Sequence, residues 1–208
     1  MKKNDIISAV NTYGYSSVET SLYSITIPLL IRDGEYHLLY EVRAETLRRQ
    51  PNEICFPGGK IEANETAKTA AIRETMEELN INDSHIEITN SLMPMTIPFG
   101  VTIYPHVAFL DVKFEMLTYN EDEVQELFTV PLSYLMRTEA EEHMVHTKVV
   151  LPEDFPFEKI QNGRDYNWSR SPYNVYFLEY NHHIIWGLTA KITNEFIHIL
   201  KKAGIGNL

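Results

Sequence analysis

The sequence predicts a layered domain of the mixed α/β or α+β class, because strand-like segments come before, between and after helix-like ones. Two observations favour this class. Asp33-Gly34 separates two apolar segments rich in Ile, Leu and Tyr, which is typical of a hairpin with a tight turn. An alanine-rich segment between Thr66 and Asn80 has the composition and the capping residues of a helix.

The expected elements alternate along the chain. Helices are expected over residues 4–11, 66–79, 132–136 and 188–202. Strands are expected over residues 22–31, 36–43, 85–97, 101–112, 175–180 and 183–186, and an acidic loop over residues 121–130 is expected to run into a short strand. The proline-containing segment 151–172 is expected to be loop-rich. We expect one domain over residues 1–208, with a short N-terminal extension and a closing C-terminal helix.

The composition narrows the class of partner. Eighteen basic and 29 acidic residues give a net charge of −11, which argues against a nucleic-acid-binding protein because phosphate backbones are bound by clustered Lys and Arg. Cys55 is the only cysteine, so no intrachain disulfide can form. The sequence contains neither a signal-peptide core nor a run of roughly 20 apolar residues. We therefore expect a cytoplasmic protein that does not enter a membrane.

Three glutamates lie on one side of the helix predicted over residues 66–79. At about 100° per residue, Glu74, Glu77 and Glu78 fall within an arc of roughly 100°. They share that side with three alanines, so other backbone can approach them closely. Like charges at these spacings cost about a few tenths of a kcal/mol each in an exposed helix. The helix alone leaves two interpretations open, a solvated acidic face or a site for a hard divalent cation.

The residues around this helix have a characteristic spacing. In order, with the intervening residues, they are Gly59, five residues, Glu65, seven residues, Arg73-Glu74, two residues and Glu77-Glu78. This pattern resembles the signature of the Nudix hydrolases. Asn80 departs from it, since the family usually has glycine there. Asn is the next most tolerated residue at a left-handed helix terminus, so we expect the departure to leave the chemistry intact.

The resemblance implies a fold and a metal site. The fold is α+β, an α/β/α sandwich in which a mixed β-sheet is flanked by helices. Glu74, Glu77 and Glu78 are implied as ligands of Mg²⁺ or Mn²⁺, and the carbonyl of Gly59 is implied to complete the set. The family cleaves a phosphate–phosphate linkage by in-line attack of water at phosphorus.

The resemblance also implies supporting and proton-transferring groups. Arg73, assigned to the catalytic set, would form an ion pair with Glu65 that holds the helix and the preceding loop in place. The alternative interpretation is that Arg73 and Glu65 form an ordinary surface ion pair. A further carboxylate acts as general base in many members, at a position that varies. Glu126 is our candidate and Glu123 the second; the alternative for both is a solvated acidic loop.

A second set of residues resembles the additional motif of the coenzyme A pyrophosphatase branch of this family. It consists of Leu39, Arg43-Ala44, Arg48 and Phe56-Pro57-Gly58-Gly59. Tyr40, Glu41 and Asn52 depart from the motif, and Asn52 stands where the branch usually has glycine. The segment 185–190 also looks like this branch, with a strand that ends at an aromatic residue, a glycine turn and a helix.

Coenzyme A carries a 3′-phosphate in addition to its diphosphate, which gives the basic loop a role. Arg43, Arg48 and Arg49 are expected to bind that phosphate, because guanidinium groups offer paired donors to phosphate oxygens. The alternative is that these arginines are solvated or pair with surface acids.

Three functions are compatible with these observations. The first is hydrolysis of coenzyme A or its thioesters to adenosine 3′,5′-bisphosphate and a 4′-phosphopantetheine. The second is hydrolysis of another nucleoside diphosphate derivative, such as ADP-ribose or a dinucleotide. The third is a non-catalytic module that senses a nucleotide, although a sensor need not keep three mutually repelling carboxylates. Because Nudix proteins are often dimers, a homodimer is among the expectations.

Overall fold

The chain forms two compact units in the computed structural model, which describes residues 3, 5, 8, 21–97, 100–168 and 172–205. The units are Met1–Arg137 and Thr138–Leu208. A single domain over the whole chain therefore stays a prediction. The helix expected over residues 4–11 lies outside the described residues, apart from positions 5 and 8.

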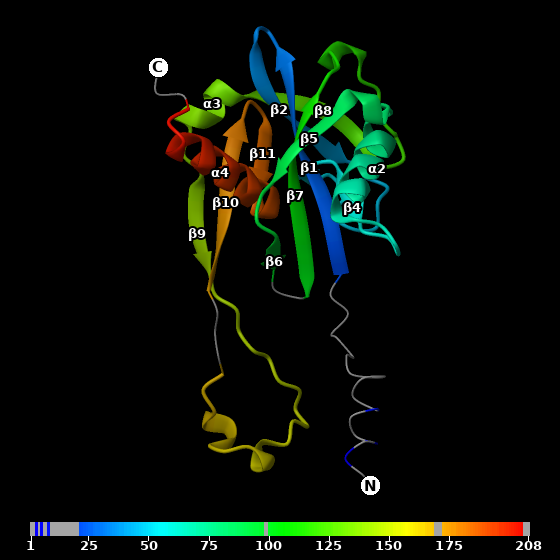
Figure 1. Ribbon diagram of the computed structural model, residues 1–208. Helices are drawn as coiled ribbons and strands as arrows, with labels where there is room; N and C mark the ends of the chain where they lie inside the picture. Colours follow the sequence, from blue (N-terminus) through cyan, green and yellow to red (C-terminus); the bar gives the residue numbers. More distant parts are fainter. Residues whose placement is uncertain are drawn as a thin grey trace. The chain divides into compact units, whose positions relative to one another are not determined.

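The larger unit is built on a mixed β-sheet that carries helices (Figure 1). Among the described residues its strands are β1 Ser21–Arg32, β2 Glu35–Arg43, β3 Ile54–Cys55, β4 Gly58–Lys60, β5 Ile86–Ser91, β6 Met95–Ile97, β7 Val101–Leu110 and β8 Val124–Pro131. Its described helices are α2 Ala67–Leu79 and α3 Leu132–Arg137, with 3₁₀ turns at Asp83–His85 and Phe114–Met116. The path β3-β2-β1-β7-β5 orders the sheet, with β4 on β1, β6 on β7 and β8 on β2. Only the pairing of β1 with β7 is parallel among the strand pairs of the described residues, which makes the sheet mixed.

The first hairpin forms where the sequence predicts it. Arg32 pairs with Glu35, so the loop between β1 and β2 consists of Asp33 and Gly34. Both residues have positive φ, 53° and 84°, as a primed two-residue turn requires.

Helix α2 begins and ends at the expected residues. The Thr66 hydroxyl accepts a hydrogen bond from the Thr69 amide, and the Thr69 hydroxyl accepts one from the Thr66 amide, which together form a capping box. At the other end Asn80 is left-handed, with φ 50° and ψ 42°. The expectation that Asn replaces glycine at this terminus is confirmed.

Helix α2 packs one apolar edge into the core of the larger unit. The buried members of this core are Leu30, Leu39, Leu79, Ile86, Ala108 and Leu110. Ile72 and Met76 of the helix and Leu127 of β8 pack against them. The face of β2 that carries Leu39 is therefore the face that α2 covers.

Two strand predictions need correction. The single strand expected over residues 85–97 is divided into β5 and β6 by residues 92–94, where Pro94 lacks an amide hydrogen for strand pairing. The strand β8 begins at Val124 and is longer than the short strand expected after an acidic loop.

The smaller unit contains a three-stranded antiparallel sheet and a helix. Its elements are β9 Glu141–Val145, β10 Tyr173–Tyr180, β11 His183–Trp186, α4 Gly187–Lys202 and two 3₁₀ turns, Phe157–Lys159 and Gly163–Asp165. The hairpin and the closing helix are confirmed, with a turn at Gly187, whose φ is 62°. Strand β9 was not predicted, because all of its residues are exposed and its sequence has no apolar alternation.

The described helices also bear on membrane insertion. None of them combines the length and the apolar character that crossing a bilayer requires.

Candidate metal centre

Helix α2 is held against β1 by two contacts through hydroxyl groups. The hydroxyls of Thr26 and Thr75 are hydrogen-bonded at 2.9 Å, and both residues are buried. The Ser24 hydroxyl donates to the carbonyl of Ala67 at 2.6 Å. Small polar side chains therefore allow close approach of the helix to the sheet, and the side of α2 that carries Glu78 faces β4.

The two glycines of β4 touch two of the helix glutamates. The amide of Gly58 donates to Oε2 of Glu78 at 2.8 Å, and only 3% of Glu78 is exposed. A Cβ on Gly59 would lie 2.2 Å from Cδ of Glu74, so glycine leaves room for that carboxylate in its present position and any other residue would displace it. Gly58 has φ 156°, and a Cβ there would lie 2.4 Å from the carbonyl oxygen of Ser24.

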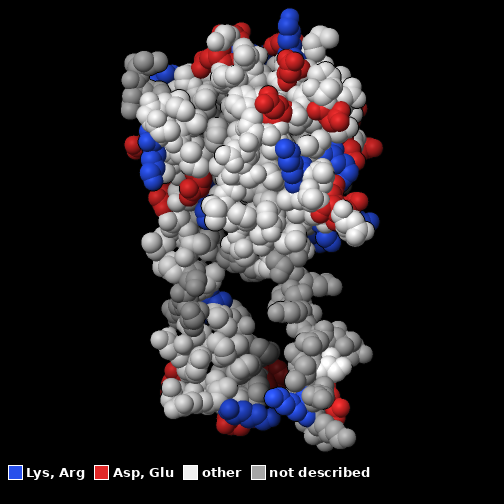
Figure 2. Space-filling model, viewed as in Figure 1, with Lys and Arg blue, Asp and Glu red and all other residues white. Residues whose placement is uncertain are grey.

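Arg73 forms hydrogen bonds with three glutamates around the site. Its Nε and Nη2 donate to the two carboxylate oxygens of Glu65 at 3.0 and 3.1 Å, so the expected ion pair is present and bidentate. Its Nη1 donates to Glu74 at 2.8 Å and to Glu77 at 3.2 Å, and Nη2 also reaches the carbonyl of Lys60 at 3.2 Å. In Figure 2, acidic and basic side chains lie beside one another on the side of the molecule where Figure 1 shows α2.

The three glutamates of the helix therefore differ in environment. Glu78 is buried and Glu74 is half-buried beside Gly59, whereas the side chain of Glu77 is 54% exposed. Burial raises the pKa of Glu74 and, well above its usual range, that of Glu78. Arg73 Nη1 donates to both Glu74 and Glu77 and so connects the two carboxylates.

A fourth carboxylate, which the sequence reasoning did not assign to the site, comes from β2. Glu41 is 1% exposed, and its Oε1 accepts a hydrogen bond from Sγ of Cys55 at 3.1 Å. Its Oε2 is buried and has no hydrogen-bond partner among the described residues. Burial raises the pKa of Glu41 to about 7, and after burial the charge of Glu41 is the largest cause of the raised pKa of Glu78. An acidic residue in the middle of an apolar strand, at a departure from the motif, was the available signal.

The acidic segment before β8 brings Glu123 to this cluster. The amide of Asn120 donates to the backbone carbonyl of Glu78 at 2.9 Å, and the carbonyl of Glu123 accepts from the amide of Ala44 at 2.9 Å. The charge of Glu123 contributes to raising the pKa of Glu41, Glu74 and Glu78, after burial as the main cause.

Glu126 lies elsewhere than expected. It belongs to strand β8, where it pairs with Val42, while the next residue, Leu127, pairs with Glu41. Directly paired residues share a face and neighbouring residues alternate. The side chain of Glu126 therefore lies on the face opposite to Glu41 and α2, which corrects its placement in a loop.

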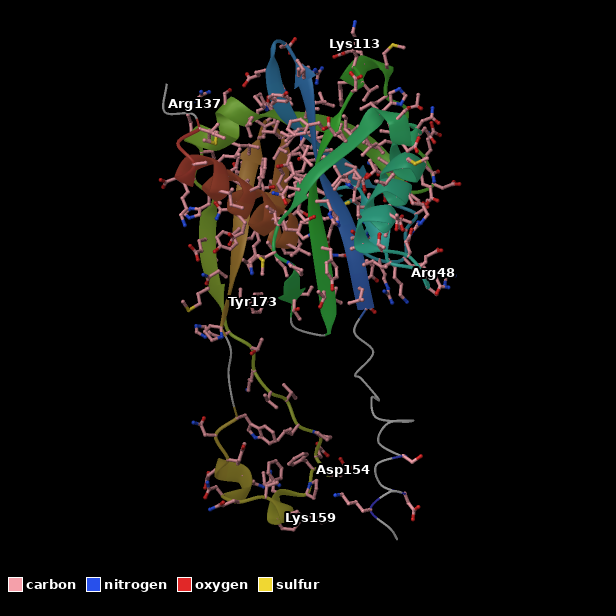
Figure 3. The ribbon with its side chains drawn as sticks, in the orientation of Figure 1. Arg48, Lys113, Arg137, Asp154, Lys159 and Tyr173 are labelled. Atoms are coloured by element: carbon pink, nitrogen blue, oxygen red, sulfur yellow. The ribbon has the colours of Figure 1, made fainter. Side chains whose placement is uncertain are left out.

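The three arginines of the basic loop are not equivalent. Arg43 ends β2 and is half-buried; its Nε is buried without a hydrogen-bond partner among the described residues. Arg48 and Arg49 are exposed in the loop that follows, and Figure 3 shows Arg48 at the surface on the side where α2 lies. Asn52 in this loop has φ 61°, so it adopts the left-handed conformation for which glycine is usual.

The donor set fits a hard divalent cation. Carboxylate and main-chain oxygens are the ligands that Mg²⁺ and Mn²⁺ prefer, and the carboxylates of Glu78 and Glu74 lie against the backbone of Gly58 and of Gly59 respectively. Carboxylates buried beside each other repel unless a proton or a cation lies between them. The Oε2 of Glu41, which has no partner among the described residues, is a further oxygen that a proton or a cation would stabilise.

Comparison with known proteins identifies the family. The NUDIX domain model matches residues 22–164. The chain belongs to the Nudix family. This Nudix hydrolase is 34% identical over 179 residues to peroxisomal coenzyme A diphosphatase NUDT7 of Mus musculus, which covers 86% of this chain and 70% of that protein. It is 29% identical over 175 residues to an uncharacterized Nudix hydrolase, NudL, of an Enterobacter species, which covers 83% of this chain and 79% of that protein.

A solved structure supports the fold. The MutT/nudix family protein from Enterococcus faecalis matches with a TM-score of 0.52 at 17% identity, over 97% of this chain and 70% of that chain. At this identity the likeness concerns the fold alone. The α+β class and the mixed sheet with flanking helices are confirmed.

Gly59→Ala tests the contact between β4 and the helix. The added Cβ overlaps the Glu74 carboxylate, so the side chain must move and its bond with Arg73 weakens. We expect the free energy of unfolding to fall by about 1 kcal/mol, the lower end of the cost of overpacking, because the displaced group is the end of a side chain. Urea denaturation without divalent ions measures it, with Lys60→Ala at the exposed next position as control. An unchanged midpoint would show that Glu74 does not depend on the glycine.

Proposed function

We propose that this Nudix hydrolase cleaves a diphosphate linkage with a divalent cation bound by Glu74, Glu77 and Glu78 and by the carbonyl of Gly59. The observation that carries the proposal is the buried carboxylate of Glu78, bonded to the Gly58 amide beside the Glu74 carboxylate. Mg²⁺ or Mn²⁺ at this position would neutralise the diphosphate oxygens and lower the pKa of a bound water.

The protein's own groups would then carry out the displacement. The oxygen of a water molecule forms a bond to one phosphorus, and the bond from that phosphorus to the bridging oxygen breaks, which gives two phosphate monoesters. Arg73 holds Glu74 and Glu77 in place from the outer side while Glu65 fixes Arg73.

We assign the general base to Glu123 in preference to Glu126. A base must reach the attacking water beside the metal ligands. Glu123 lies in a turn that is hydrogen-bonded to the backbone of Glu78 through Asn120. Burial is the main cause of the raised pKa of Glu78, and the nearby charge of Glu123 raises it further. Strand alternation directs Glu126 to the other face of the sheet, which removes its geometric support.

Coenzyme A or one of its thioesters is the substrate that we propose. The chain is 34% identical to a protein named as a coenzyme A diphosphatase, and that name is the main support. Arg48 and Arg49 are exposed in the basic loop, where they can bind the 3′-phosphate, and Arg43 has an unpartnered Nε in the described chain. The products would be adenosine 3′,5′-bisphosphate and a 4′-phosphopantetheine.

The competing substrates are ADP-ribose and dinucleotides, and the remaining alternative is a module that only senses a nucleotide. A homodimer and a cytoplasmic location remain predictions; the relative from mouse is named as peroxisomal. Neither bears on the chemistry of the site.

Glu78→Gln tests the catalytic proposal. Incubated with Mg²⁺ or Mn²⁺ and a panel of coenzyme A, its thioesters, ADP-ribose and dinucleotides, the unchanged protein should convert coenzyme A compounds fastest, as read by mass spectrometry. The variant should lose at least about a hundredfold in turnover because it lacks one ligand charge. Circular dichroism serves as the folding control. Near-normal turnover by the variant would remove Glu78 from the site, and preference for ADP-ribose would remove coenzyme A.

Glu123→Gln and Glu126→Gln, compared side by side, test the assignment of the base. General-base catalysis contributes about 10²–10⁴-fold, so Glu123→Gln should lower kcat by that order while Mn²⁺ affinity stays close to normal. Glu126→Gln should lose less. Initial rates at saturating substrate measure both, and the reverse ranking would return the assignment to Glu126.

Arg48→Ala tests recognition of the 3′-phosphate. Removal of an exposed phosphate-binding arginine should raise KM for coenzyme A by about tenfold, because hydrogen bonds to charged groups contribute about 1.5–3 kcal/mol. KM for 3′-dephosphorylated coenzyme A should change little. Steady-state kinetics with both substrates measures the difference. An equal loss for the two substrates would show that Arg48 does not bind that phosphate.

A further inference from the structure

Strand β2 places a buried carboxylate opposite the helix glutamates. Glu41 is 1% exposed and pairs with Leu127 across β8 and with Cys55 across β3. Leu127 packs on the core that includes Leu79, the residue after Glu78. The side chain of Glu41 therefore lies on the face of the sheet that α2 covers, and after burial its charge is the largest cause of the raised pKa of Glu78.

The hydrogen bonds of Glu41 are incomplete. Oε1 accepts one bond, from the thiol of Cys55, a weak donor. Oε2 is buried and has no partner among the described residues. A buried carboxylate oxygen without a partner is unfavourable, and a proton or a cation bound there would remove that cost.

One positive and two negative side chains act on the Glu41 carboxylate besides the thiol of Cys55. Besides Cys55, the charged groups that affect the pKa of Glu41, which burial raises most, are Arg43 and the acidic Glu123 and Glu74. No ion pair joins Arg43 to Glu41 in the described chain, and the Nε of Arg43 is itself without a hydrogen-bond partner there. The positive charge of Arg43 therefore acts on the Glu41 carboxylate without a hydrogen bond or an ion pair to it, and Oε2 stays without a partner among the described residues.

We propose that Glu41 is a fourth carboxylate of the cation site. Its Oε2, on strand β2, binds the same divalent ion that Glu78 binds from helix α2. A hard divalent ion such as Mg²⁺ or Mn²⁺ suits this set, because each added carboxylate increases affinity for such ions. This inference rests on the proposed function, since it requires that Glu78 binds a cation.

One structural alternative makes a different prediction. Glu41 could carry a proton and donate a hydrogen bond to a neighbouring carboxylate, as a carboxyl pair does without any metal. Glutamine preserves such a donor and also keeps an oxygen for the thiol of Cys55, but it lacks the charge that a cation requires.

The experiment measures Mn²⁺ binding without any nucleotide. Mn²⁺ is titrated into the full-length protein, Glu41→Gln and Glu87→Gln, and the free ion is followed by electron paramagnetic resonance. Glu87 is an exposed carboxylate on β5, so its variant matches the loss of one charge outside the site. We expect Glu41→Gln to lose about tenfold or more in affinity relative to Glu87→Gln.

The outcomes separate this inference from the proposed function. A loss of at least about fivefold relative to Glu87→Gln supports the role of Glu41, and a smaller loss or a gain in affinity overturns it. If the unchanged protein and Glu87→Gln bind Mn²⁺ and Glu41→Gln binds equally, only the role of Glu41 fails. If the unchanged protein itself binds no Mn²⁺, the proposed function fails together with it.

A second measurement guards against misfolding. A ligand that binds only the folded state raises Tm, so Mn²⁺ should raise the Tm of the unchanged protein more than that of Glu41→Gln. If Glu41→Gln does not melt cooperatively, Glu41→Leu replaces it, because leucine matches the apolar neighbours Leu39 and Leu127. An equal Mn²⁺-induced shift in the unchanged protein and in the folded variant overturns the proposal.

Discussion

The close contact between helix α2 and the glycines of β4 is the constraint on which the site depends. A carboxylate as buried as that of Glu78 is tolerated because the Gly58 amide donates to it, and this geometry exists only where the backbone comes within 2.8 Å of the carboxylate. Side chains at positions 58 and 59 would collide with the carbonyl of Ser24 and with the carboxylate of Glu74. Hydrogen bonds from Ser24 and Thr26 of β1 hold the helix at this distance. The placement of the carboxylates therefore depends on how the helix packs against the sheet.

Local signals predicted most of this arrangement. The Asp33-Gly34 hairpin and the caps of α2 depend on residues within a few positions of each other, so their chemistry is readable in the sequence. The spacing of the glutamates also predicted that backbone can approach their side of the helix, and the contact of Gly58 with Glu78 agrees with this. Asn80 is left-handed in place of the usual glycine, which the side chain of Asn tolerates.

The features that the sequence did not predict depend on contacts between distant segments. Strand β9 has no buried residue, so its position follows from pairing with β10, which lies about thirty residues away in the chain. Glu126 was placed in a loop because its neighbours are acidic, whereas register with β2 determines both its strand and its face. Glu41 was not assigned to the site, because the alternation of residues along β2 cannot reveal that one face of the strand meets a helix that begins at residue 67.

The distribution of positive charge around the cluster explains why its two sides differ. Arg73 lies on the outer side, where it contacts Glu65, Glu74 and Glu77 and reduces their mutual repulsion. On the inner side, burial raises the pKa of Glu41 to about 7 and that of Glu78 well above its usual range, and no arginine or lysine forms an ion pair with either in the described chain. The residues between β2 and α2 therefore favour a proton when no cation is bound, and under the proposed function a divalent cation would take its place. The outer arginine then keeps the helix glutamates in position whichever of the two is present.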